Sequence, residues 1–184
     1  HPARFVPLIY AVIQQLSPVF FWKIAEQPFF PLLLNQQTPG WIWISIFRAA
    51  LLLERFEITS WLLERDDLQL NKPDGSPLDV VFACNSAYGD GLINFIVTQP
   101  KLLQVIGSKQ SNVENFCLML HSRVMTHDSA DLLERVLNKV SFAPALVRHV
   151  IGSGPFTGEY LLHMAFDAAA FKCASVLLSI PETP

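Results

Sequence analysis

The chain has 184 residues, of which 51% are apolar and 16% are charged, and its formal net charge is −3. This length suffices for one domain with a sizeable core, and the apolar composition excludes intrinsic disorder. The slight negative charge and the lack of a Lys/Arg cluster argue against binding to nucleic acid or to an anionic membrane surface. The three cysteines are odd in number and far apart. They favour a reducing compartment, so we predict a cytoplasmic protein.

The N-terminal segment, HPARFVPLIYAVIQQLSPVFFWKI, lacks the basic region and clean apolar run of a signal peptide. No run of 18 apolar residues is free of charge or proline, so we predict no transmembrane helix. Because His1 has no methionine before it, we expect the chain to be a piece of a longer protein. The aromatic residues around Phe20–Trp22 and Phe29–Phe30 predict an apolar N-terminal end. That end would pack on the rest of the parent chain or on a partner, or self-associate.

Helical periodicity dominates the rest of the chain. The segments FEITSWLLERDD and SADLLERVLNKV both place apolar residues at i, i+3, i+4 and i+7. Ser129 is a plausible N-cap of the second segment. Prolines and glycines divide the sequence into pieces that suit helices of two or three turns, and long alternating strand patterns are absent. We therefore predict an all-α protein made of short helix pairs.

Self-comparison of the chain indicates an internal repeat with a loose period. The shared pattern is a small residue, Pro-Leu and a polar residue, followed by two helices, the second ending in Leu-Leu. It predicts a single repeat domain over 1–184 with four to five units, some degenerate, near 5–37, 44–71, 74–104, 112–140 and 156–180. The fourth unit is hard to align with the others.

The last unit begins with GEYLLHMAF, which resembles the ankyrin-repeat pattern G-x-T-P-L-H-x-A-A. Gly158 takes the turn glycine, Leu162 the leucine, His163 the histidine and Ala165 the first alanine. In the second unit, SIFRAALLLERFEITSWLLE also aligns without a gap, with Ser45 at the threonine position. The resemblance implies a solenoid of stacked helix-turn-helix units. The alternatives are a solenoid of the HEAT or armadillo type and an irregular helical domain.

Several positions depart from the family pattern. Tyr160 and Leu161 replace Thr-Pro in the last unit, and Trp43 stands at a turn-glycine position in the second. Residues 85–91, NSAYGDG, lengthen the loop between the helices of the third unit. The resemblance implies that His163 is structural, with its ring joining groups of neighbouring units. Replacing it would then cost the roughly 1–3 kcal/mol of a lost buried hydrogen bond.

Candidate catalytic and metal sites are sparse. Cys117 and His121 share a helix face and suit a nucleophile and its base, but no oxyanion motif or orienting residue is evident. Together with His127 they lack a recognisable fourth zinc ligand. The glycine-rich segment 151–159 has no lysine in the phosphate-loop position. We therefore predict no cofactor, no metal and no enzymatic activity.

The family resemblance implies a module that binds a partner protein through the repeat tips and the concave face. The residues predicted to contact the partner are Gln37, Trp41, Lys72, Asp74, Tyr88, Asp90, Phe156, Glu159 and Asp167. The alternatives are a scaffold or non-catalytic part of a larger enzyme, a cryptic Cys-His hydrolase, and a purely structural role. The divergent Leu/Phe-rich repeats are also similar to those of ankyrin proteins that intracellular bacteria secrete. That similarity implies a host protein as partner, in the host cytosol or nucleus.

Overall fold

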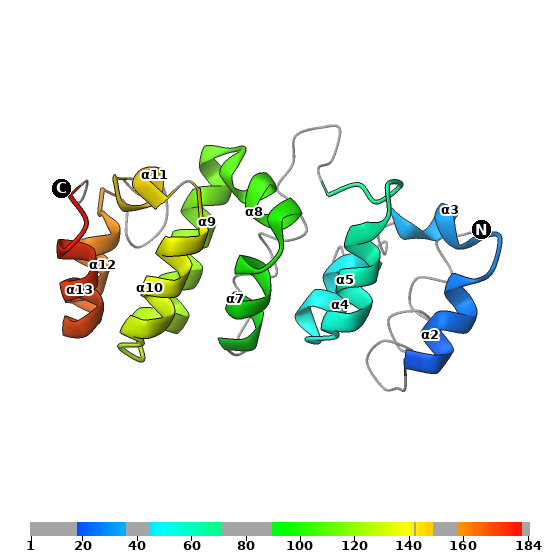
Figure 1. The fold of residues 1–184 in the computed structure, drawn as a ribbon, viewed down its shortest axis with the longest axis horizontal. Helices are drawn as coiled ribbons and strands as arrows, with labels where there is room; N and C mark the ends of the chain where they lie inside the picture. The colour runs from blue at the N-terminus through cyan, green and yellow to red at the C-terminus, as the bar shows by residue number, and fades with distance from the viewer. Residues whose placement is uncertain (1–17, 36–44, 71–89, 142, 149–157, 182–184) are drawn as a thin grey trace. The chain divides into compact units, whose positions relative to one another are not determined.

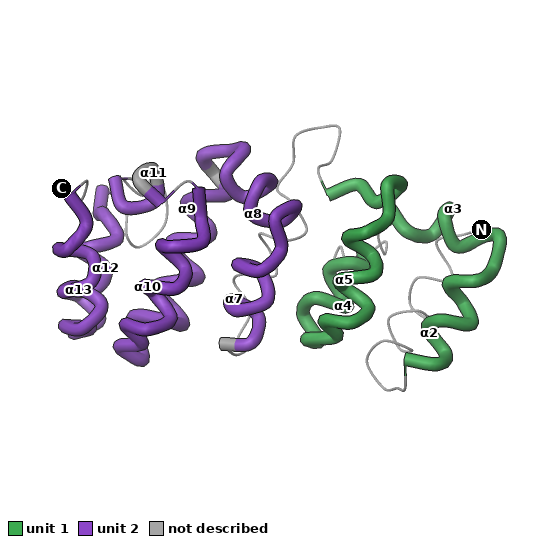
Figure 2. The backbone as a smooth tube through the Cα atoms, viewed as in Figure 1, with its two compact units in different colours: residues 1–83 green, residues 84–184 purple. Residues whose placement is uncertain are grey.

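The computed structural model describes residues 18–35, 45–70, 90–141, 143–148 and 158–181 (Figure 1). Every regular element within these residues is helical, which confirms the predicted all-α class. Contacts between residues divide the chain into two compact units, unit 1 over residues 1–83 and unit 2 over residues 84–184 (Figure 2). The division falls inside the predicted third repeat, 74–104. The single repeat domain stays a prediction.

Unit 1 contains α2 (Pro18–Ala25), α3 (Phe30–Leu34), α4 (Ile46–Leu52) and α5 (Phe56–Glu64). Helix α3 packs on α4, and α4 packs on α5. The Oγ atom of Ser45 accepts a hydrogen bond from the backbone N–H of Arg48 at 3.1 Å. Ser45 is thus the N-cap of α4, as its place in the predicted repeat implied, and it satisfies one of the unpaired amides of the first turn.

An aromatic cluster joins α2 and α3 to α5. The ring centroid of Phe21 lies 5.0 Å from that of Trp22, 5.9 Å from that of Phe30 and 5.8 Å from that of Trp61, each pair edge to face. The Arg65 guanidinium lies over the Trp61 ring, 5.1 Å from its centroid. Edge-to-face rings and a cation over an indole are both favourable arrangements. This cluster therefore buries part of the predicted apolar N-terminal end within unit 1 itself.

The rest of that apolar end stays on the surface. Phe21, Phe30, Leu33 and Leu34 are buried, whereas Phe20 and Leu32 are 53% and 63% exposed. The guanidinium of Arg65 that lies over Trp61 also forms a bidentate ion pair with the carboxylate of Asp67, with N–O distances of 2.8 and 2.7 Å. The side chain of Asn35 donates to the carbonyl of Asp67 at 2.7 Å and accepts from the N–H of Gln69 at 2.8 Å. These bonds fasten the segment after α5 to the end of α3.

Unit 2 holds the longer run of helices. It contains α7 (Asp90–Val97), α8 (Pro100–Gly107), α9 (Gln110–Leu120), the π-helical turn η2 (His121–Met125), α10 (Ala130–Lys139), α11 (Ala143–Arg148), α12 (Leu161–Asp167) and α13 (Phe171–Leu178). Helix α10 packs between α7 and α13, and η2 packs on α12 (Figure 1). The second helices of successive predicted repeats thus form one row, with first helices behind them.

Three helix pairs share one turn. Glu54, Asp128 and Ala169 adopt the left-handed conformation, with φ of 53°, 48° and 54°. In each case the next residue donates its N–H to a carbonyl five residues earlier, at 2.9, 2.9 and 2.8 Å. The pairs α4–α5, η2–α10 and α12–α13 are therefore built alike. Asp128 therefore aligns the fourth predicted unit, which the sequence alone left unaligned, with the second unit at Glu54 and the last unit at Ala169.

Several local predictions were wrong. Asp90 and Gly91 lie in the first turn of α7, not in the long loop predicted over 85–91. Ser129 occupies the N-cap position of α10, as predicted, but its side chain makes no capping hydrogen bond. Helices α8 and α11 have no counterpart in the predicted helix pairs. Both are short helices, and the apolar pattern of each is too brief to assign from the sequence.

Candidate partner-binding site

Most of the predicted contact residues fall outside the described structure. Six of the nine do so: Gln37, Trp41, Lys72, Asp74, Tyr88 and Phe156. Asp90 is the first residue of α7. Only Glu159 and Asp167 have described side chains. The prediction that the repeat tips form one binding surface therefore stays a prediction.

Glu159 and Asp167 stand at opposite ends of α12. They are eight residues apart, which along a helix corresponds to about 12 Å. Glu159 is half-buried, and its Oε2 atom is enclosed without a hydrogen-bond partner among the described residues. Asp167 is exposed, and its charge partly offsets the lowering of the His121 pKa that burial causes. The structure does not bring the two carboxylates together, so they are separate candidates.

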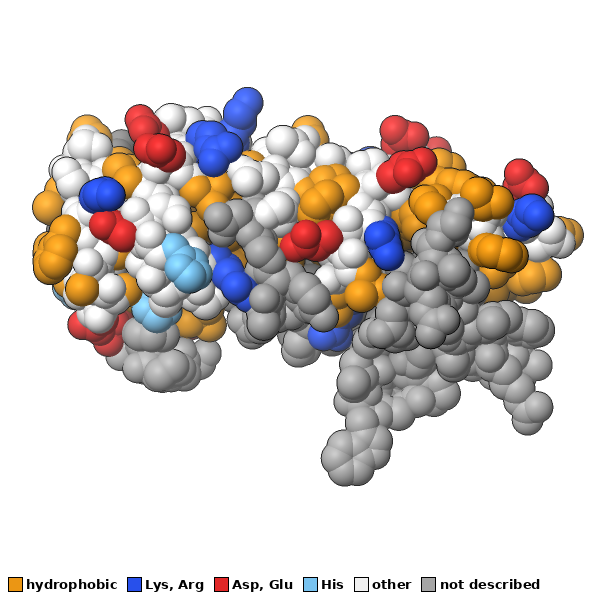
Figure 3. Space-filling model, turned by 90° about the horizontal axis from the view of Figure 1, so that it is seen from below, with side chains coloured by type: hydrophobic (Ala, Val, Ile, Leu, Met, Phe, Trp, Pro, Cys, Tyr) orange, Lys and Arg blue, Asp and Glu red, His pale blue; other side chains and the backbone are white. Residues whose placement is uncertain are grey.

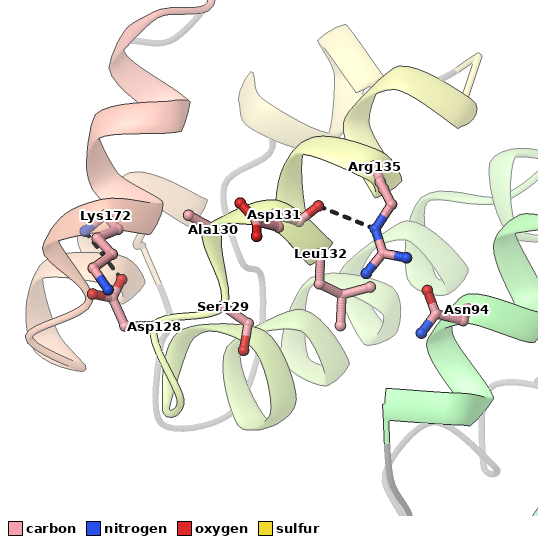
Figure 4. A pocket seen from close by; sticks show the side chains of 8 residues that line it. All are labelled: Asn94, Asp128, Ser129, Ala130, Asp131, Leu132, Arg135 and Lys172. Carbon is pink, nitrogen blue, oxygen red and sulfur yellow. Dashed lines mark hydrogen bonds between the residues drawn. The ribbon is translucent and has the colours of Figure 1, made fainter.

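A pocket that the sequence did not predict lies on the row of second helices in unit 2. Figure 4 shows this pocket from close by. Its volume is about 320 Å³. It is lined by Asn94 from α7, by Asp128 and Ser129 from the shared turn, by Ala130, Asp131, Leu132 and Arg135 from α10, and by Lys172 from α13. Its walls thus come from three consecutive predicted repeats, and its polar groups include two carboxylates and two cations.

Asp128 forms one edge of this pocket and also joins two helix pairs, η2–α10 and α12–α13. Its Oδ1 atom accepts hydrogen bonds from the backbone N–H groups of Lys172 and Cys173, both at 3.0 Å. These amides belong to the first turn of α13, where helical N–H groups have no partner within the helix. Asp128 therefore caps α13 from 44 residues away, and its negative charge favours the positive end of that helix.

Arg135 and Asn94 form the opposite edge. The Nε of Arg135 donates to the carbonyl of Asp131, one helical turn earlier, at 3.3 Å. Its guanidinium extends toward the amide of Asn94 on α7 (Figure 4). The ion pair found among the described residues is Arg65–Asp67, in the other unit, so no ion pair in the described part of the chain neutralises Arg135. A guanidinium beside an amide suits the binding of a carboxylate or of peptide carbonyls.

The two described cysteines are buried and unactivated. Burial raises the pKa of the Cys117 thiol to about 12, with a further contribution from the charge of Glu114. Burial, followed by the charge of Asp128, raises the pKa of Cys173 to about 11. Burial also lowers the pKa of His121. A catalytic cysteine requires the opposite shift, because the thiolate is the nucleophile. Among the described residues, no group of three His, Cys, Asp or Glu side chains is placed to hold a metal ion.

His163 does not have the position expected of it. The residue is exposed and does not lie on a core face. Its Nδ1 atom accepts the backbone N–H of Tyr160 at 3.3 Å, and the two rings meet edge to face with centroids 5.5 Å apart. The ring thus accepts a hydrogen bond at the start of its own helix, α12. The side chain at position N3 of a capping box acts in the same way. The prediction that replacing His163 costs the stability of a lost buried hydrogen bond is therefore wrong, since water reaches the site.

Comparison of the chain with models of protein families, with curated proteins and with solved structures found no match in any of the three. None of the described helices has the length and apolar character needed to cross a membrane.

Proposed function

We propose that this chain is a protein-binding module built from divergent ankyrin-like repeats. The observation that supports this most is the pocket whose walls come from α7, α10 and α13, because a site assembled from successive repeats is typical of solenoid binding proteins. The recurrent left-handed turn at Glu54, Asp128 and Ala169 supports the repeat assignment. The family pattern G-x-T-P-L-H-x-A-A continues as x-x-G-H, and this left-handed turn falls at the glycine of that continuation.

The chemistry of the pocket favours a polar segment of a partner protein. Arg135 and Asn94 offer donors on one edge, and Asp131 offers an exposed carboxylate beside them. A peptide presents both carbonyl acceptors and N–H donors, so a pocket with both signs of charge suits an extended chain better than a simple ion. We propose a partner segment with a carboxylate that pairs with Arg135.

The test is a comparative pull-down from cell lysate, with bound proteins quantified by mass spectrometry. The pocket variants are Arg135→Ala and Lys172→Ala, and the matched control is Lys139→Ala, an exposed cation of α10 outside the pocket. The proposal expects one set of proteins retained by wild type and control and lost with the pocket variants. Equal recovery by all four proteins would contradict the pocket as the binding site.

The predicted tips need their own variants. Trp41→Ala and Tyr88→Ala test them in the same pull-down, and unchanged binding in both would remove the tips from the proposal.

We further propose that the module works in the cytosol, and in a host cell if it is a secreted effector. The similarity of its Leu/Phe-rich repeats to those of secreted ankyrin proteins supports the effector role. The test is to express the tagged chain in host cells and locate it by imaging and fractionation.

A further inference from the structure

The pocket on α7, α10 and α13 holds two opposite charges on a single helix. Asp131 and Arg135 both belong to α10, both are exposed, and neither forms an ion pair within the described part of the chain. The hydrogen bond that joins them runs from Nε of Arg135 to the backbone carbonyl of Asp131 (Figure 4). It therefore leaves the carboxylate of Asp131 and the terminal nitrogens of the Arg135 guanidinium available to a ligand.

The other two charges of the pocket are placed differently. Oδ1 of Asp128 accepts the backbone N–H groups of Lys172 and Cys173 at the start of α13, both at 3.0 Å. Lys172 thus shares its edge of the pocket with a negative charge that is fixed by these bonds (Figure 4). Asp131 and Arg135 are the charges that remain to distinguish one ligand from another.

Asn94 supplies a group that suits the main chain of a ligand. Its side chain lines the pocket from α7, and its amide has no hydrogen-bond partner among the described residues. A side-chain amide carries both an acceptor and donors, so it can bind a C=O and an N–H group of a peptide. A helical ligand uses these groups internally, whereas an extended chain leaves them free. Asn94 therefore favours an extended segment.

The spacing of the two charges on α10 determines the spacing of the matching charges in such a segment. Asp131 and Arg135 are four residues apart, which corresponds to about 6 Å along the helix axis. In an extended chain, side chains two residues apart point to the same side and lie about 6.5 Å apart. Adjacent side chains point to opposite sides, and those four apart are about 13 Å distant. An acidic and a basic residue separated by one residue fit best.

We propose that the pocket recognises an extended partner segment in which one residue separates an acidic from a basic residue. The acidic side chain pairs with Arg135, and the basic side chain pairs with Asp131. This inference rests on the proposed function, in which the pocket is the partner-binding site, and it adds Asp131 as a specificity-determining residue. On the face of unit 2 drawn in Figure 3, the described acidic and basic side chains are interspersed. That distribution favours a ligand of mixed charge over one of a single sign.

Selection of short random peptides displayed on phage, with the whole chain as target, tests the charge pattern. We expect wild type to enrich peptides with an acidic and a basic residue one residue apart. Asp131→Lys should change the enriched pair to two acidic residues, and Arg135→Glu should change it to two basic residues. The control is Lys139→Glu, a charge reversal on α10 outside the pocket, which should keep the preference of wild type. Helical circular dichroism checks that each variant is folded.

Titration with synthetic peptides then tests the spacing. The probes are an enriched peptide and two relatives in which no residue, or two residues, separate the same two charges. The altered spacing should weaken binding up to about fivefold, because it breaks one exposed ion pair. Added salt should reduce this difference, since it screens exposed charges. Equal affinity of the three peptides would overturn the inference.

The selection separates this inference from the proposed function. Enriched peptides that lose binding in Asp131→Lys or Arg135→Glu but lack the paired charges would overturn the inference and leave the pocket as the binding site. The same peptides enriched by wild type and by both variants, or no enrichment at all, would contradict the inference and the proposed function together.

Discussion

Asp128 is the residue whose replacement tests the repeat architecture most directly. In Asp128→Ala the amides of Lys172 and Cys173 lose the carboxylate that both contact at 3.0 Å. The Cys173 amide is partly buried, and a hydrogen bond to a charged group contributes roughly 1.5–3 kcal/mol. Water replaces the bond to the exposed Lys172 amide, and loss of an N-cap costs about 0.5–2 kcal/mol. We expect α13 to lose about 2 kcal/mol of local stability.

Native-state hydrogen exchange is the suitable assay because stacked repeats open locally. A loss of about 2 kcal/mol should speed exchange of the α13 amides roughly 30-fold. Asp128→Asn keeps an oxygen acceptor and tolerates the φ of 48°, so it should cost under about 1 kcal/mol. Asp128→Gly loses the acceptor but relieves backbone strain of roughly 1 kcal/mol, so it should lie between Asn and Ala.

Asp131→Ala is the control, because Asp131 shares the pocket without capping α13. It should leave α13 exchange as it is in wild type. The reasoning would be refuted if Asp128→Ala left the exchange of Lys172 and Cys173 unchanged. It would also be refuted if Asn were as damaging as Ala, since the acceptor oxygen would then be irrelevant.

Four further predictions concern unit 2. Ala169→Gly should raise stability to urea by up to about 1 kcal/mol, because the left-handed backbone at φ 54° strains alanine, whereas Ala168→Gly, at φ −78°, should lower it. Burial holds the pKa of His121 below its ordinary 6.5, so the unfolded state binds more protons and unit 2 should lose stability as pH falls through 6.5. Because the charge of Asp167 raises that pKa, an NMR titration of Asp167→Asn should give a lower value for His121. With its pKa raised from 9.0 to about 12, Cys117 should react with iodoacetamide about a thousandfold more slowly than an unperturbed thiol, and fast labelling would revive the Cys-His hydrolase.

Local signals in the sequence predicted the elements that local chemistry determines. The helices 56–64 and 130–139 show a clear apolar period, and Ser45 is a good N-cap residue. Burial of an apolar face and capping of a first turn need residues only a few positions apart. That is why they can be read from a single sequence.

The residues at the left-handed turn positions give no clear sequence signal for aligning the predicted units. The left-handed positions hold Glu54, Asp128 and Ala169, although glycine adopts this conformation at least cost. Without glycine there, the fourth unit had no landmark in its sequence. Asp and Asn are the non-glycine residues that best tolerate such a backbone, so the Asp-Ser pair before the apolar run at 130–139 was the available signal.

Contacts over long sequence separations escaped prediction. The two bonds from Asp128 to α13 join residues 44 and 45 positions apart, and no local pattern indicates them. The pocket depends on α7, α10 and α13 lying in one row, which results from the packing of these helices and not from any local pattern. The exposure of His163 was misjudged because its apolar neighbours suggested a core position, whereas the helix turns this residue to the solvent side.

The aromatic cluster of unit 1 has an optical consequence. All four tryptophans of the chain, Trp22, Trp41, Trp43 and Trp61, lie within residues 1–83, and none lies in 84–184. The rings of Trp22 and Trp61 are 5.3 Å apart, close enough for their excited states to couple. Tryptophan fluorescence, excited at a wavelength that tyrosine does not absorb, therefore reports on unit 1 alone, while far-ultraviolet circular dichroism sums both units. A chain whose emission changes at one denaturant concentration and whose ellipticity changes at another would reveal, without any label, two halves that unfold separately.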